Sequence, residues 1–356
     1  MTMNATRRHG LSAALATLVL AGVGLAGCST GTESGSAGSS SSGTAGESAG
    51  ESGGSAQRFA IPDSMPEGKG SDQSDGAFPR TVAHFQGETT IDSAPKKVVV
   101  VSTGQADALL NLGIVPVGST SGDGADMIPD YLTADFPEHA AELADVRDVG
   151  SRTDPDIETI ANIDPDLILM NTAGKNADQL YSQLTAIAPT VATQGTGLHW
   201  KEDYLLLADA VGKREEAQTW LDTYEGEAKK FGEALGDAPT VSFLRRNGDR
   251  MRVFGESSFT GSVAADAGLR RPETQSFTDK TSQDIGAEQL EQADADWIFY
   301  GVQGGDDTAL TEQPLWKTLG AVGAGQAVSV DDDVFYLNTG PTAARDVLDK
   351  LEDTLA

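Results

Sequence analysis

The sequence contains a single cysteine, Cys28, among its 356 residues. With one thiol, the chain can form neither an internal disulfide framework nor a cysteine-based zinc cluster. Histidine is almost as scarce, because only His84, His139 and His199 remain beyond the first residues, far apart in the sequence. A receptor for a bare metal ion needs histidines and carboxylates at ligand spacing. The sequence therefore does not support such a receptor.

Positive charge is also scarce. The chain has 25 lysines and arginines against 54 acidic residues, which gives a net charge of −29. Without residues 1–27 the balance is 23 against 54, or −31. Such a surface repels nucleic acid and anionic lipid headgroups, so we expect no nucleic-acid partner. A local basic pocket can still hold a small anion, because salt screens charges over about 8 Å at physiological ionic strength.

The sequence lacks G-x-x-x-x-G-K and H-E-x-x-H, and its G-x-S-x-G matches, at residues 46–50 and 50–54, fall in a Ser/Gly-rich stretch without the strand and helix patterns of a nucleophile elbow. The one G-x-G-x-x-G match, at residues 22–27, has no strand or βαβ unit around it and so does not indicate dinucleotide binding. Scattered Ser, His and Asp residues can still come together in space. An enzyme is nevertheless the least supported class, and we do not expect one.

The first 27 residues have the features of a signal peptide. Arg7 and Arg8 precede a run of about 15 mostly apolar residues from Leu11 to Leu25, shorter than the roughly 20 residues of a membrane-spanning helix. The run ends in Leu-Ala-Gly-Cys at residues 25–28, which resembles the bacterial lipobox. This resemblance implies cleavage before Cys28, lipid attachment to that cysteine, and an anchor in the cell membrane at its extracytoplasmic face.

Residues 28–77 have the composition of a flexible tether. Ser, Gly, Ala, Thr and Glu make up almost all of 29–57, and Pro, Gly and charged residues dominate as far as about Gly76. Such a segment cannot form a hydrophobic core. As a flexible coil, roughly 50 residues span about 40 Å. This length lets a tethered folded body move over a membrane.

The rest of the chain alternates short strand patterns with helical patterns. Val98 to Val101, for example, is the β-branched run of a buried parallel strand. The alternation predicts an α/β lobe at 78–200 and a second, with a terminal helix, at 237–356. Between them, helical spacing of apolar residues predicts a connecting helix at 201–236, formed as one helix of about 30 residues or as two in line. The predicted fold is two Rossmann-like α/β lobes joined by one long helix.

An internal similarity supports the two lobes. Residues 158–169 align without gaps to residues 288–299, with the same glutamate at the start and the same two aspartates further on. A helix-to-strand junction favours aspartate at the turn, but this preference does not account for the shared glutamate. We therefore expect the same helix, turn and strand in each lobe.

The order and spacing of these segments resemble the periplasmic-binding family that serves ferric siderophores, cobalamin and haem. The resemblance covers nearly the whole body from about residue 80 and is carried by 98–118, 157–169, 200–212, 241–272, 285–300 and 314–341. It is closest to the ferric-siderophore branch. It implies a monomeric helical-backbone solute-binding protein that holds its ligand between two lobes and docks on an ABC importer permease dimer. Iron then enters only as part of the siderophore, with no cofactor and no metal site of the protein's own.

Candidate ligand-binding residues follow from where ligands sit in two-lobed α/β proteins, outside the carboxyl ends of the strands. This rule selects Gln105 after the first strand, Trp200 before the long helix, and Tyr300 at the end of the repeated strand. Aromatic rings with a polar group suit a bulky organic chelate. Each aromatic side chain is explained equally well by the core, and this alternative is stronger for Phe259, Phe335 and Tyr336, which are the weaker candidates.

The most informative candidates are arginines. Arg245, Arg246, Arg250 and Arg252 lie within eight positions around Asn247-Gly248, a turn signal that predicts a hairpin. Guanidinium groups are permanently charged and direct several donors toward ligand oxygens. The resemblance favours Arg245 and Arg252 as ligand-binding residues, and Arg246 stays with them because the register at the turn is ambiguous.

The resemblance also implies a docking role for Glu158 and Glu288, one in each lobe, which would meet basic groups of a two-fold permease. A glutamate near a helix start also gains from the helix dipole, so this position has a simpler explanation. The class of siderophore does not follow from the sequence. A haem or cobalamin receptor of the same fold remains an alternative, in the haem case with a His or Tyr axial ligand.

Overall fold

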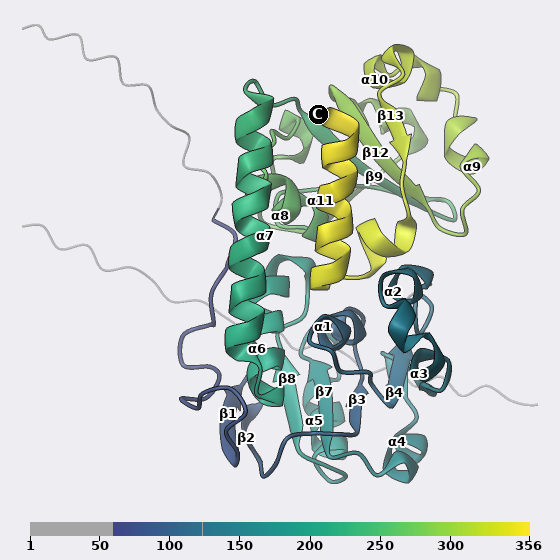
Figure 1. Ribbon diagram of the computed structural model, residues 1–356. Coiled ribbons are helices and arrows are strands. Elements are labelled where there is room, and N and C mark those ends of the chain that lie inside the picture. Colours follow the sequence, from purple (N-terminus) through teal and green to yellow (C-terminus); the bar gives the residue numbers. More distant parts are fainter. Residues whose placement is uncertain (1–59, 123) are drawn as a thin grey trace, which may run out of the picture. The chain divides into compact units, whose positions relative to one another are not determined.

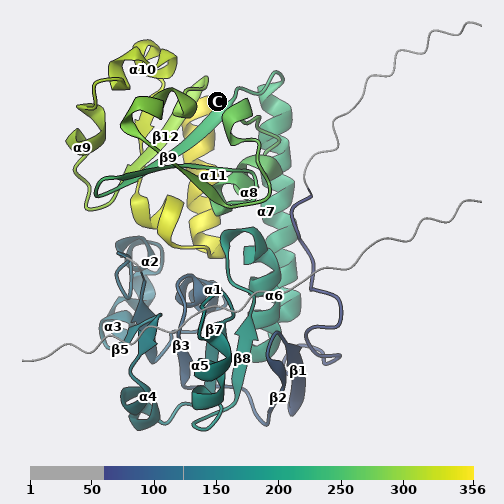
Figure 2. The same ribbon diagram turned by 180° about the vertical axis from the view of Figure 1, so that it is seen from behind.

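The computed structural model describes residues 60–122 and 124–356. The predicted signal peptide, Cys28 and the tether as far as residue 59 lie outside the described residues. Within the described part, no helix combines the length and hydrophobicity needed to cross a bilayer. Figures 1 and 2 show two lobes, each built on its own sheet, and one long helix, α7 (Arg214–Leu235), that runs along both. The predicted fold class is confirmed.

The N-terminal lobe is built on a six-stranded sheet in the order β6-β5-β4-β3-β7-β8. Its neighbouring strands are parallel, except for the short pair β5 and β6. A separate hairpin, β1–β2, precedes the sheet. The strands are β1 (Arg80–His84), β2 (Gly87–Ile91), β3 (Val98–Val100), β4 (Gly118–Ser121), β5 (Arg147–Ser151), β6 (Asp154–Pro155), β7 (Leu167–Asn171) and β8 (Thr190–Thr193).

Helices cover both faces of this sheet, which explains why its central strand is apolar throughout. Val98 and Val100 of β3 pack in one core cluster with Leu109 of α1. Val99, which points to the opposite face, packs in another with Ile160 of α4. The helical elements of the lobe are α1 (Gln105–Asn111), α2 (Asp130–Asp135), η1 (Pro137–His139), α3 (Ala140–Ala144), α4 (Ile157–Ile163), α5 (Ala177–Leu184), η2 (Gly197–His199) and α6 (Trp200–Val211).

The C-terminal lobe has a five-stranded sheet in the order β11-β10-β9-β12-β13. Strands β9, β12 and β13 are parallel, and β10 runs antiparallel to both of its neighbours. The predicted hairpin is confirmed as β9–β10, whose register pairs Arg245 with Arg252. The strands are β9 (Val241–Asn247), β10 (Arg250–Phe254), β11 (Ser282–Ile285), β12 (Trp297–Val302) and β13 (Ala327–Ser329).

Short helical elements surround this second sheet, and a long terminal helix packs beside α7 (Figure 1). Arg345 of the terminal helix forms an ion pair with Glu227 of α7. The predicted terminal helix is confirmed as α11. The elements are α8 (Phe259–Asp266), η3 (Glu273–Gln275), η4 (Ala287–Ala293), α9 (Thr308–Thr311), η5 (Trp316–Thr318), α10 (Gly320–Ala324), η6 (Asp333–Leu337) and α11 (Pro341–Leu355).

The repeated segments occupy equivalent places in the two sheets. The first is α4 followed by β7, and the second is the 3-10 helix η4 followed by β12. Asp166 accepts hydrogen bonds from the backbone N–H groups of Lys96 and Lys97, just before β3. Asp296 does the same for Thr240, just before β9. The shared aspartate thus fastens each strand to the start of its parallel neighbour.

The predicted connecting helix is two helices, and their expected arrangement in line is wrong. Gly212 ends α6 with φ 77°, and α7 begins at Arg214. The ring of Trp200, at the start of α6, lies 5.5 Å from that of Tyr224 in α7. Two in-line helices would separate these residues by about 36 Å at 1.5 Å per residue. The helices therefore form an antiparallel hairpin, and α7 alone links the lobes.

Buried polar contacts join the lobes beside α7. Lys201 of α6, whose side chain is 1% exposed, pairs with Glu225 of α7 at 2.7 Å and with Asp266 of α8 at 2.9 Å. On the other side, Asp107 of α1 accepts hydrogen bonds from the first turn of α11, at 2.8 Å from Thr342 and 3.0 Å from Ala343. The first helix of the N-terminal lobe thus caps the last helix of the chain.

The described end of the predicted tether, residues 60–77, packs on the N-terminal lobe instead of forming a free coil. Gly70 pairs with Ala83 of β1. The Ser71 hydroxyl donates to Asp209 of α6 at 3.0 Å, and the same carboxylate forms a fully buried ion pair with Arg80. Sequence composition cannot show these contacts, because each depends on a partner far along the chain.

Candidate ligand-binding site

A cavity of about 560 Å³ lies between the two lobes. Its N-terminal wall comes from residues that follow strands, including Thr103 after β3, Asn171 at the end of β7 and Thr196 after β8. Its opposite wall includes the end of β9 and the segment before α11. The cavity therefore lies at the carboxyl ends of the parallel strands, where the sequence analysis expected the ligand.

One face of the β9–β10 hairpin forms the charged wall of this cavity. Arg245, Arg250 and Arg252 line it, together with Asn247 and Phe254. Successive side chains of a strand point to opposite faces, so Arg246 lies on the other face and does not line the cavity. The structure thus resolves the register that the sequence left open. Arg246 is thus excluded from the cavity wall, and Arg250, which was not among the predicted ligand-binding residues, is included.

Aspartates hold the three hairpin arginines that line the cavity. Arg245, 6% exposed, makes a two-point contact with Asp332, with Nε and Nη2 each 2.7 Å from a carboxylate oxygen. Arg250 and Arg252 share Asp284 of β11, with Nε atoms 2.7 and 3.2 Å from Oδ1. Arg245 is therefore rigidly placed, whereas Arg250, with half its side chain exposed, is freer to follow a ligand.

An aromatic group forms the apolar part of the same wall. Phe259, Phe335 and Tyr336 line the cavity beside Phe254. The rings of Phe254 and Tyr336 lie 4.9 Å apart, and the Tyr336 hydroxyl donates to the Phe299 carbonyl at 2.8 Å. Burial raises the pKa of Tyr336 well above its usual value, so the phenol stays neutral. The three weaker candidates, Phe259, Phe335 and Tyr336, thus all line the cavity.

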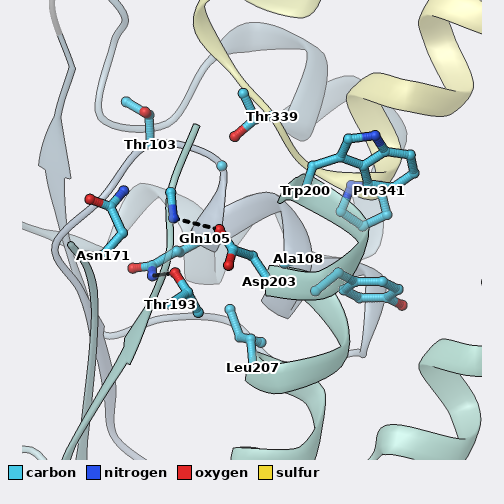
Figure 3. A pocket seen from close by; sticks show the side chains of 13 residues that line it. Thr103, Gln105, Ala108, Asn171, Thr193, Trp200, Asp203, Leu207, Thr339 and Pro341 are labelled. Carbon is cyan, nitrogen blue, oxygen red and sulfur yellow. Dashed lines mark hydrogen bonds between the residues drawn. The ribbon is translucent and has the colours of Figure 1, made fainter. Parts of the chain in front are cut away.

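Gln105 and Trp200 lie around a second, much smaller cavity of about 30 Å³, shown in Figure 3. The Gln105 amide donates to the Met170 carbonyl at 3.0 Å. Trp200 is 2% exposed, and its indole N–H donates to Ser262 of α8 at 3.0 Å. This space holds about one water molecule. The structure therefore places both residues in the packing between the lobes, outside the larger cavity.

Tyr300 also lies in the core. It is 8% exposed, its ring edge contacts Trp316 with centroids 5.0 Å apart, and its hydroxyl is 3.4 Å from Asp307. It does not line the cavity between the lobes. For Tyr300 and Trp200 the structure thus corresponds to the alternative of a core aromatic.

A strained loop borders the cavity. Thr196 has φ 74° and ψ 149°, a backbone conformation that side chains other than glycine rarely adopt. The Asp203 carboxylate holds this loop by accepting from the backbone N–H groups of Gln194 at 2.8 Å and Gly195 at 2.7 Å. Burial raises the pKa of Asp203 to about 7. Next to it, a Cβ on Gly197 would collide with Phe259, so the two lobes touch here.

Sequence reasoning missed the neutral N-terminal wall, the arginine that joins it, and the acidic partners. Thr103 and Asn171 each follow a predicted strand, so the rule that selected Gln105 also applied to them. Arg152 follows β5, a strand that was not predicted from the sequence. Nothing in the sequence pointed to Asp284 or Asp332, because their arginine partners lie 32 to 87 residues away.

No metal centre is found in the described part of the chain. Within residues 60–122 and 124–356, no group of three or more His, Cys, Asp or Glu side chains is placed to hold an ion. The two predicted docking residues, Glu158 in the first turn of α4 and Glu288 in the first turn of η4, are both exposed.

The signature of the periplasmic binding protein family matches residues 98–334, about two thirds of the chain. The chain belongs to this family. Its periplasmic binding protein fold accounts for both lobes and for α7 between them. The family consists of binding proteins, so the expectation that the chain is not an enzyme is confirmed.

Individual relatives support this assignment. The probable siderophore-binding lipoprotein YfiY of Bacillus subtilis is 33% identical over 290 residues, which cover 77% of this chain and 86% of YfiY. The Fe(3+)-citrate-binding protein YfmC of the same organism is 28% identical, covering 81% of this chain and 91% of YfmC. Among solved structures, Staphylococcus aureus SirA complexed with staphyloferrin B has a TM-score of 0.66 at 27% identity, covering 77% of this chain and 98% of SirA.

Proposed function

We propose that this periplasmic binding protein is the extracytoplasmic receptor of an iron uptake system, which binds a ferric siderophore between its lobes and delivers it to an ABC importer. The observation that carries the proposal is the cavity between the lobes, whose walls contain four arginines and an aromatic group. The names of the relatives, which include a siderophore-binding lipoprotein and a Fe(3+)-citrate-binding protein, agree with this ligand class.

The two parts of the wall suit the two parts of such a ligand. A ferric siderophore presents iron-bound oxygens, which accept hydrogen bonds from guanidinium groups. Its organic scaffold is largely apolar and packs against aromatic rings such as those of Phe259 and Tyr336. Iron reaches the protein inside its chelate, so the receptor needs no cofactor of its own.

An equilibrium titration tests the proposal. Purified protein should bind at least one ferric siderophore with sub-micromolar affinity by calorimetry. Arg245→Ala or Arg252→Ala should weaken this binding about ten-fold or more, because charge-assisted hydrogen bonds contribute about 1.5–3 kcal/mol. Parental affinity in both variants would show that the ligand binds elsewhere.

A haem or cobalamin receptor of the same fold is not favoured, because the relatives are named for siderophores and ferric citrate. The aromatic cavity residues include one tyrosine, Tyr336, and its hydroxyl is already bonded to the Phe299 carbonyl. Adding haem to the same preparation should therefore give no shifted Soret band.

We further propose that Glu158 and Glu288 dock the receptor on basic groups of the permease. Both are exposed, and each starts the repeated unit of its own lobe. In the double variant Glu158→Arg with Glu288→Arg, siderophore affinity and thermal stability should persist while uptake by cells collapses. Losing one partner of a buried interface pair costs about 2–5 kcal/mol. Normal uptake by the folded double variant would show that both glutamates only stabilise the starts of their helices and do not dock the receptor.

The anchor belongs to the same proposal, although Cys28 lies outside the described residues. A lipid on Cys28 would hold a monomeric receptor close to its permease in the same membrane. Cys28→Ser should release the protein into the medium, and retention at the parental level would exclude this anchor.

A further inference from the structure

The large cavity has an uneven distribution of charge for so acidic a chain. Its lining residues include Arg152, Arg245, Arg250 and Arg252 but no aspartate, glutamate, lysine or histidine from the described part of the chain. Because the whole chain carries a net charge of −29, this concentration of positive charge is specific to the cavity. Anionic groups are therefore drawn to this place on a surface that otherwise repels them.

The aspartates beside the cavity compensate only part of this charge. Asp332 and Asp284 are two carboxylates for the three hairpin arginines. Both carboxylates accept hydrogen bonds from the Nε atoms of their arginine partners. The Nη1 and Nη2 groups of Arg250 and Arg252 consequently have no hydrogen-bond partner among the described residues. Four terminal amino groups on one face thus remain available to a ligand.

The opposite wall carries mostly neutral polar groups. Thr103, Asn171 and Thr196 offer hydroxyl and amide groups, which bond ligand oxygens whatever the ligand charge. The preference of the cavity for charged over neutral ligands must therefore come mainly from the arginines of the β9–β10 hairpin. A neutral chelate that covers Arg250 and Arg252 would remove water from their guanidinium groups without supplying a counter-charge, which is unfavourable.

We propose that the cargo is an anionic ferric chelate of the carboxylate or catecholate type, with at least two negative charges, and that Asp284 sets the charge it must carry. This inference rests on the proposed function. Asp284 is half exposed and is shared by Arg250 and Arg252. Its negative charge therefore lowers the positive potential that these arginines present to a ligand. A ligand with several anionic oxygens outweighs this carboxylate, whereas a neutral trihydroxamate complex does not.

Calorimetric titrations with three iron complexes test the inference: a ferric hydroxycarboxylate, a ferric tricatecholate and a neutral ferric trihydroxamate. At least one of the anionic complexes should bind at least 100-fold more tightly than the neutral one. Raising NaCl from 50 to 500 mM should weaken the anionic complex about ten-fold and change the neutral one less than two-fold, because salt screens charge interactions. Whichever anionic complex binds more tightly shows whether the cargo is of the carboxylate or the catecholate type.

Single substitutions assign the effect to the hairpin. Arg250→Gln should weaken the anionic complex about ten-fold, whereas Arg270→Gln should leave it unchanged. Arg270 is a matched control, because its side chain is 55% exposed against 53% for Arg250 and is also paired with an aspartate, Asp237, but does not line the cavity. Asp284→Asn keeps an acceptor oxygen and removes the charge, so it should tighten anionic binding about three-fold at low salt.

The outcomes separate the two proposals. If no ferric complex binds, the proposed function is wrong. If the neutral trihydroxamate binds as tightly as either anion, the receptor function stands and the charge inference is wrong. Equal anionic affinities in Arg250→Gln, Asp284→Asn and the parent would likewise overturn the role of the hairpin while leaving the function intact.

Discussion

Asp107 shows how much one side chain contributes to this fold. Its carboxylate is 1% exposed and accepts hydrogen bonds from the Tyr131 hydroxyl at 2.9 Å and from two backbone N–H groups of α11. Burial raises the pKa of this carboxyl, while these hydrogen bonds lower it. The cap and the capped helix are 235 residues apart in the chain. The Asp107 carboxylate therefore caps the first turn of α11 from the other lobe and links the two lobes.

Asp107→Ala should lower the free energy of unfolding by about 2–4 kcal/mol, because it removes the cap and leaves buried donors without a partner. Urea unfolding followed by circular dichroism measures the change. Asp156→Ala is the control, since Asp156 is an exposed N-cap of α4 that bonds only Thr159 of its own helix. That variant should lose only about 1 kcal/mol. Equal losses would show that this cap between the lobes contributes no more to stability than a local one.

For single residues, the sequence predicted which residue types form the ligand site better than it predicted which side chains face the ligand. The arginine cluster was visible from composition, because guanidinium groups are rare in this chain and gather around one turn. Trp200 and Tyr300 have the same position relative to strands as true wall residues, yet both are buried in the core. Which side of a strand or helix faces the ligand depends on packing against distant segments, and no local pattern contains that information.

Among the elements, the hairpin of α6 and α7 departs most from the sequence interpretation. Helical spacing continues on both sides of Gly212, so periodicity alone cannot distinguish a long helix from two that fold back on each other. The reversal depends on Gly212, with φ 77°. A Cβ there would lie 3.0 Å from the Phe78 ring and 3.2 Å from Arg80.

Gly212→Ala should therefore destabilise the protein by about 1–2 kcal/mol through its left-handed backbone. Gly226→Ala, within α7, should act in the opposite direction. A Cβ at Gly226 would meet no described atom within 4 Å, and alanine favours a helix interior by about 0.5–1 kcal/mol over glycine. Thermal unfolding of the two variants beside the parent tests the pair. A loss of stability in both would contradict the assignment of Gly212 as the reversal point.

The whole molecule was more predictable than its internal contacts. Alternating strands and helices, with a repeated helix–strand unit, correctly predicted two α/β lobes, because these signals are local and each lobe builds its own sheet. The contacts that join the lobes, such as Lys201 with Asp266, were not predicted. They depend on the relative placement of whole elements.

Stability should depend on pH in an unusual direction. Burial raises the pKa of Asp203 and Asp346 to about 7 and that of Asp266 and Asp333 to about 6. Unfolded aspartates titrate near 3.9, so the folded state binds more protons above that pH, and its stability falls as pH rises through 6 to 7. Burial lowers the pKa of His84 to about 4, which costs stability as pH falls from 6.5 toward 4.

Because four acids oppose one histidine, we expect the unfolding free energy to be about 1–3 kcal/mol greater at pH 5.5 than at pH 7.5. Thermal melts in buffers of equal ionic strength measure this difference. Asp203→Asn should reduce the dependence, since the amide keeps an acceptor oxygen but does not titrate. A melting temperature that is higher at pH 7.5 would show that these acids are ionised in the folded protein.

The packed segment 60–77 has a mechanical consequence for a receptor held by its N-terminus. Any pull on that end meets three contacts with the fold: Met65, which packs against the core, Gly70, which pairs with β1, and Ser71, which bonds Asp209 of α6. The force then passes into the buried pair of Arg80 and Asp209. The contacts of Gly70, Ser71 and Arg80 all lie within the N-terminal lobe, as the position of this segment beside β1 in Figure 1 shows. Tension on the proposed anchor would thus load the N-terminal lobe before the C-terminal lobe.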